Sequence, residues 1–291
     1  MSVRDQSRGR WVGAALLAAT STTSLAGCFL GASDGVSDPK SVAIYDVAHD
    51  EFKKGRLREA LAKVNEALEV DRDNADAAHL GALIYLAFCA KGEDSNDCRY
   101  EQAEKLARLA VKRNAELREA KNTLAVILIH EKKHDEAIEI LKLLTEDILY
   151  GSPQTSWGNL GWAYLEKGDA DHAIDALRRA VASQPNFCVG NYRLGAAYEK
   201  KGELKAAIAA YSRALATERP GCNRIQEAWE GRARASAGAG LVEEARGDYT
   251  KCIELARNTE SGERCAVEII KLSSAVGASH EGGAPKGEPP G

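Results

Sequence analysis

Apolar and small residues recur along this chain at the three-to-four spacing of one helix face, in pairs of segments divided by a short break. Residues 154–187 show the pattern most clearly, because Gly168 divides two periodic segments and Pro185 follows the second. Such spacing predicts a helix–turn–helix. The periodic positions of this stretch are Trp157, Leu160, Gly161, Tyr164, Ala173, Leu177 and Ala180.

The pattern occurs six times and predicts six helix pairs. In the second pair the second helix comes about ten residues late, after an inserted loop. One such pair cannot bury its apolar face alone, so the pairs are expected to stack into an all-α superhelix over residues 41–276. The predicted pairs span residues 41–74, 75–117, 118–153, 154–187, 188–221 and 226–259.

The stretch 154–187 resembles the tetratricopeptide repeat, which recurs about every 34 residues and carries a Trp, Leu-Gly, Tyr, Ala, aromatic and Pro signature. Trp157, Leu160, Gly161 and Tyr164 match that signature, whereas Leu177 replaces the aromatic residue. The resemblance implies a tetratricopeptide-repeat (TPR) superhelix of about six helix pairs.

The two ends of the chain differ in character from the repeats. Residues 1–27 hold a basic segment and then a short apolar segment, as in a secretory signal peptide. Leu25–Cys28 reads Leu-Ala-Gly-Cys, which resembles a bacterial lipobox and implies cleavage before Cys28 and its lipidation. An ordinary signal peptide with a coincidental cysteine is the alternative. Residues 28–40 are expected to be a flexible tether, residues 262–275 an amphipathic capping helix, and residues 277–291 a disordered tail.

Charge and motifs narrow the class of function. With 39 basic and 43 acidic residues the net charge is −4, which argues against nucleic-acid binding. The run 130–134 spells His-Glu-Lys-Lys-His, a pattern that binds zinc when one helix carries both histidines. Here the repeat register puts a turn between His130 and His134, so a zinc hydrolase using them and Glu131 is the disfavoured alternative. No cofactor motif is present, and no enzyme is predicted.

Six cysteines besides Cys28 predict disulfides, because exported proteins fold in an oxidising compartment. Six cysteines allow fifteen pairings. The repeat register favours a staple across the inserted loop, a bridge between the last repeat and the cap, and a bridge between the heads of two successive first helices. The alternative is that some cysteines, such as Cys252 at an alanine position, are buried thiols. The favoured pairs are Cys89–Cys98, Cys252–Cys265 and Cys188–Cys222.

A binding groove is predicted along the first helix of each pair, at the positions not used for stacking. Such a groove takes a peptide, with aromatic anchors supplying most of the affinity. Packing of Trp162 and Tyr192 between neighbouring repeats is the alternative for those two residues. The candidate groove residues are Tyr45, Phe52, Tyr85, Asn122, Asn159, Trp162, Leu165, Tyr192 and Arg193.

The segment Asn159–Leu165, together with the lipobox and about six repeats, resembles the pilotin lipoproteins of type IV pili, the PilF, PilW and Tgl group. Asn159, Gly161, Trp162 and Leu165 match the segment of that family. The resemblance implies a lipid-anchored protein of the outer membrane that faces the periplasm and helps a secretin to localise and assemble. A different envelope scaffold, serving outer-membrane protein insertion or recruiting a protease, is the alternative partner class.

Overall fold

A computed structural model describes residues 37–90 and 96–281, which fold into helices and one short 3-10 helix, η1. The predicted signal peptide, Cys28 and most of the predicted tether lie outside these residues. Among the described residues no helix is long and apolar enough to cross a membrane. The helices are α1 Pro39–Lys53, α2 Leu57–Val70, α3 Ala75–Cys89, α4 Tyr100–Arg113, α5 Arg118–His130, α6 His134–Glu146, α7 Pro153–Lys167, α8 Ala170–Ser183, α9 Cys188–Lys200, α10 Leu204–Ala216, η1 Cys222–Arg224, α11 Gln226–Gly238, α12 Val242–Leu255 and α13 Glu260–Glu281.

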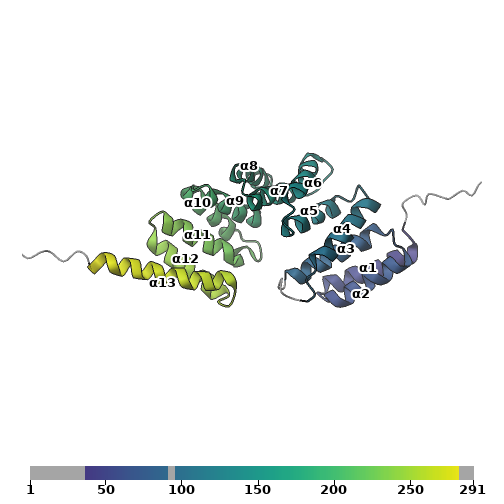
Figure 1. Cartoon of the computed structure of the whole chain (residues 1–291), viewed down its shortest axis with the longest axis horizontal. Coiled ribbons are helices and arrows are strands. Elements are labelled where there is room, and N and C mark those ends of the chain that lie inside the picture. Colours follow the sequence, from purple (N-terminus) through teal and green to yellow (C-terminus); the bar gives the residue numbers. More distant parts are fainter. Residues whose placement is uncertain (1–36, 91–95, 282–291) are drawn as a thin grey trace, which may run out of the picture. The chain divides into compact units, whose positions relative to one another are not determined.

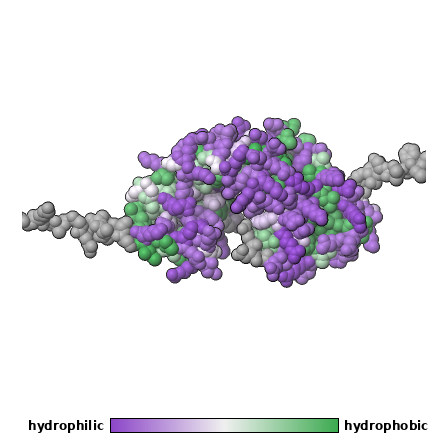
Figure 2. All heavy atoms as spheres, in the orientation of Figure 1, coloured by the Kyte–Doolittle hydropathy of each residue, from purple (hydrophilic) through white to green (hydrophobic). Residues whose placement is uncertain are grey.

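The helices pack in pairs, and each pair packs on the next (Figure 1). The first helix of each pair also contacts the first helix of the following pair, so α5, α7 and α9 lie side by side. The predicted all-α superhelix of stacked TPR-type pairs is confirmed. Because the apolar stripe of each helix is covered by its neighbours, the face seen in Figure 2 is largely hydrophilic.

Close approach of the helices depends on small residues opposite large ones. Tyr211 of α10 is 1% exposed and its ring lies against Gly195 of α9 and Gly231 of α11. A Cβ atom at position 195 would lie 2.6 Å from Cδ1 of Tyr211. One tyrosine thus fills the space between two first helices, and only glycine leaves room for it.

The described residues contain three disulfides, which join the pairs that the repeat register favoured. Their Cα–Cα distances lie in the range usual for disulfides. The pairs are Cys89–Cys98 at 4.4 Å, Cys188–Cys222 at 5.7 Å and Cys252–Cys265 at 6.4 Å.

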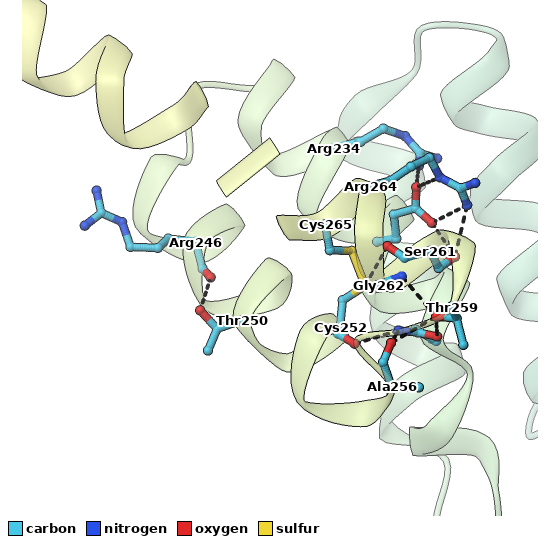
Figure 3. The surroundings of a disulfide bond; sticks show 12 residues. Arg234, Arg246, Thr250, Cys252, Ala256, Thr259, Ser261, Gly262, Arg264 and Cys265 are labelled. Carbon is cyan, nitrogen blue, oxygen red and sulfur yellow. Dashed lines mark hydrogen bonds and ion pairs between the residues drawn. A yellow bond between two sulfur atoms is a disulfide. The ribbon is translucent and has the colours of Figure 1, made fainter. Parts of the chain in front are cut away.

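Helix α13 closes the C-terminal end of the stack through a polar cluster beside the Cys252–Cys265 disulfide (Figure 3). The carboxylate of Glu230, 3% exposed, accepts hydrogen bonds from Ser261 Oγ at 2.6 Å, Arg264 Nε at 2.7 Å and Arg234 Nη1 at 2.9 Å. Burial acts to raise the pKa of Glu230, but the hydrogen bonds from Arg264 and Ser261 outweigh it and hold this pKa below its ordinary value of 4.5.

The helical boundaries differ from the predictions at both ends. Helix α1 begins at Pro39, inside the predicted tether, because the Asp38 side chain accepts from the backbone of Lys40 and caps the helix. Helix α13 is Glu260–Glu281 and so extends past position 277, where the disordered tail was predicted to begin. One internal glycine costs a helix only about 1 kcal/mol, which does not force an end at position 277.

Substitution Gly195→Ala should lower the free energy of unfolding by about 1–3 kcal/mol, because the new methyl group displaces the buried Tyr211 ring. Urea denaturation measures the change. Gly247→Ala is the matched control, since nothing lies within 4 Å of its added Cβ in α12 and the change should stabilise by about 0.5–1 kcal/mol. Equal effects of the two substitutions would contradict the close approach.

The Glu230 cluster should make the free energy of unfolding depend on pH in the acid range. A carboxylate whose folded pKa is lowered stabilises the protein above its unfolded pKa, and this contribution is lost as the pH falls through the folded pKa, here below 4.5. Glu230→Gln should therefore destabilise by about 1–3 kcal/mol at pH 7, and the difference from wild type should shrink as the pH falls below 4.5. Glu243→Gln, at a carboxylate that is 78% exposed, should change little at any pH. A pH-independent difference for Glu230→Gln would contradict the ionised cluster.

Candidate functional site

Three side chains from successive first helices meet in one hydrogen-bonded line, here called the polar row: Asn122 of α5, Asn159 of α7 and Arg193 of α9. Asn159 donates through Nδ2 to Oδ1 of Asn122 at 3.0 Å and accepts through Oδ1 from Nη1 of Arg193 at 2.9 Å. Asn122 and Asn159 are 37 residues apart in the sequence, and Asn159 and Arg193 are 34 residues apart; both separations are close to the length of one repeat. Stacking of the first helices therefore brings equivalent positions of three repeats together.

The guanidinium of Arg193 carries the charge of the polar row. It lies 4.3 Å from the centre of the Trp162 ring, and its Nη1 also donates to the carbonyl of Gly158 at 3.3 Å. Among the described residues it forms no ion pair, and burial lowers the pKa of Arg193 to about 10. The group stays protonated at neutral pH, so a half-buried cation lies here without a carboxylate partner.

Trp162 contacts both neighbouring repeats. Its ring meets the edge of His130 at 5.1 Å on the α5 side and faces Arg193 on the α9 side. Its Nε1 donates to Glu166 Oε1 at 3.1 Å. These contacts fit the alternative in which the tryptophan packs between repeats, although its half-buried ring still borders the polar row.

The other candidate groove residues fall in three places. Tyr45, Phe52 and Tyr85 are half-buried on α1 and α3 and pack on the apolar cluster of the first two pairs. Tyr192 packs against the main core, 6.2 Å from the Tyr211 ring, and burial raises its pKa. Leu165 borders a hollow near the polar row.

That hollow, of about 420 Å³, lies among the ends of α7, α9 and α11 and is lined by several charged residues that the sequence analysis missed. Glu199 accepts from Arg234 Nε at 2.8 Å and from the Tyr211 hydroxyl at 2.7 Å. Glu166 is exposed and follows Trp162 by one helical turn. Helical spacing from the predicted positions could have pointed to Glu166, but no spacing rule identifies the pairing of Glu199 with Arg234.

The His-Glu-Lys-Lys-His run does not lie on one helix. His130 ends α5 and His134 begins α6, with Lys132 at φ 62° in the turn between them. The Glu131 carboxylate lies 2.9 Å from Lys133 Nζ. In the part of the chain that is described, no group of three or more His, Cys, Asp or Glu side chains could hold a metal ion. The arrangement that helical zinc sites require is absent from this run.

Comparison with protein families identifies tetratricopeptide repeats in the chain. One family model described as tetratricopeptide repeat matches residues 116–186 and a second matches residues 159–221, which together cover α5 to α10. Repeats of this class typically bind proteins through an extended surface and do not catalyse reactions. A comparison with curated protein sequences found no match.

Solved structures with this fold include proteins of unrelated roles. The chain is similar to PilW, a type IV pilus biogenesis factor, with TM-score 0.65 and 18% identity over 78% of this chain and 99% of PilW. It is also similar to PilF of Pseudomonas aeruginosa, with TM-score 0.61 and 16% identity over 78% and 97%. The Cut9–Hcn1 tetramer of the APC/C gives TM-score 0.65 and 16% identity, but only 42% of its chain is covered. At these identities the likeness shows the fold alone.

Proposed function

We propose that this chain is a protein-binding scaffold and that the polar row holds an acidic segment of its partner. The observation that carries the proposal is the Arg193 guanidinium, which is half-buried on the first helices and forms no ion pair with any described carboxylate. The charge of Glu166 acts on it from a distance, but that carboxylate accepts a hydrogen bond from Trp162 instead. A cation removed from water without an opposite charge is costly, so a partner that brings the carboxylate gains from the pairing.

The donor atoms of Arg193 that form no hydrogen bond to a described residue have the geometry to bind a carboxylate. Both of its hydrogen bonds come from Nη1, which leaves the donors on Nε and Nη2 without an acceptor among the described residues. Nε and Nη2 lie on one edge of the planar guanidinium, and that edge binds a carboxylate with two parallel hydrogen bonds. The Trp162 ring and the Asn159 amide fix the orientation of the guanidinium, so the partner meets a preorganised donor pair.

For the partner itself, we propose a secretin subunit of a type IV pilus system, with the chain anchored to the outer membrane by a lipid on Cys28. Two observations support this choice. The fold of this chain covers nearly the whole of PilW and PilF, whereas it covers less than half of the Cut9 chain at the same TM-score as PilW. The Leu-Ala-Gly-Cys sequence at Leu25–Cys28 and the segment Asn159–Leu165 also resemble the pilotin lipoproteins.

The test is affinity capture from detergent-solubilised bacterial envelopes, using wild type, Arg193→Gln and Arg179→Gln. Arg179 is the matched control, because it also lies over a tryptophan, at 4.8 Å from the Trp157 ring, but on the second helix α8. Arg193→Gln keeps a donor for Asn159 and removes the charge, so partner recovery should fall about tenfold. Arg179→Gln should bind like wild type, and melting temperatures confirm that both variants fold.

Recovery of a secretin subunit that depends on Arg193 supports the whole proposal. If outer-membrane insertion machinery or a protease is recovered instead, and its recovery depends on Arg193, the protein is a binding scaffold but the secretin is not its partner. If no recovered protein responds to Arg193→Gln, the polar row is not the binding surface.

A further inference from the structure

A pocket of about 310 Å³ lies between α2 and α3, beside the chain that follows Cys98. It shares no residue with the polar row or with the hollow at the ends of α7, α9 and α11. Its inner wall is apolar and is formed by Leu61 of α2 with Tyr85 and Phe88 of α3. Its volume is at the small end of the range for ligand sites, which suits one bulky side chain.

Polar groups without partners surround this apolar wall. The side-chain amide of Asn65 and the hydroxyl of Tyr85 have no hydrogen bond to any described residue, and the only hydrogen bond of the Arg99 guanidinium is a long one, 3.4 Å, from Nε to the carbonyl of Asn96. Asp97 is already paired with Arg58 at 2.7 Å. The rim therefore presents one free cation and two free polar groups, with a net charge of +1 from its two arginines and one aspartate.

The Cys89–Cys98 disulfide holds the two walls of the pocket together. Phe88 precedes Cys89 on α3, and Asp97 and Arg99 flank Cys98 on the opposite side. The bridge brings these two points of the chain to a Cα–Cα distance of 4.4 Å. A pocket that combines apolar side chains with several polar groups, and whose two sides are joined by a covalent link, is preorganised for a ligand.

We propose that this pocket is a second peptide-binding site and takes a bulky apolar side chain that is followed by an acidic residue. The apolar side chain lies against Leu61, Tyr85 and Phe88, while the carboxylate pairs with Arg99. The positive rim selects against basic peptides. The site is independent of the polar row, so it stands or falls separately from the proposed function.

The test uses three hexapeptides with acetylated and amidated ends, titrated into the full-length protein with its disulfides intact: Gly-Ser-Phe-Glu-Ser-Gly, Gly-Ser-Phe-Lys-Ser-Gly and Gly-Ser-Ala-Glu-Ser-Gly. Amide NMR shifts are followed at the pocket. The Phe-Glu peptide should give saturable shifts at Ala62, Tyr85 and Phe88. The Phe-Lys and Ala-Glu peptides should bind at least about fivefold more weakly.

Two variants locate the site. Ala62 is exposed at the edge of the pocket, so Ala62→Phe fills the space without disturbing the core and should abolish the shifts. Arg99→Glu should weaken the Phe-Glu peptide about two- to fivefold, whereas Arg72→Glu, the same charge change on an exposed residue outside the pocket, should not. Equal binding of the Phe-Glu and Phe-Lys peptides, unchanged binding by Ala62→Phe, or no saturable shift at the pocket would each overturn the proposal.

Discussion

The fold depends on one constraint: the apolar face of each helix pair can be covered only by the next pair. Alanine and glycine along the helices allow the close approach that this requires, as Tyr211 between Gly195 and Gly231 illustrates. The same stacking places the first helices side by side. Residues one repeat apart in sequence then become neighbours in space, which is how Asn122, Asn159 and Arg193 form a single line.

The stacking also determines which side chains surround the charge at Arg193. Several arginines of the described chain pair with carboxylates of a neighbouring segment, as Arg118 does with Asp147 and Arg232 with Asp248. The Arg193 guanidinium instead donates to the side chain of Asn159 on the preceding first helix and lies over the Trp162 ring. These neighbours orient the guanidinium but do not neutralise it. The contact with the Trp162 ring uses this charge, but no described carboxylate forms an ion pair with it, which is why we assign its remaining donors to a partner.

The sequence predicts the helix pairs well because their signal is local and repeated. The predicted glycine breaks lie in turns, and the predicted alanine positions are buried. Helix α4 begins late, at Tyr100, as the insertion in the second pair predicted. The surroundings of the candidate site residues were predicted less completely, and their role in binding stays a prediction. The register identified Asn159 and Arg193, but whether Trp162 faces a ligand or a neighbouring repeat depends on contacts with His130 and Arg193 that no local pattern contains. The pocket beside Cys98 depends on where Asp97 and Arg99 lie relative to α2 and α3, which repeat periodicity does not describe.

The central claim is that the partner lies along the first helices at the polar row. Photo-crosslinking in living cells tests it most directly, with benzoylphenylalanine placed at position 166, beside Trp162, or at position 175 on the exposed side of α8. The account predicts a covalent adduct with the partner from position 166 and none from position 175. An adduct from position 175 alone would place the partner on the second helices and contradict the claim.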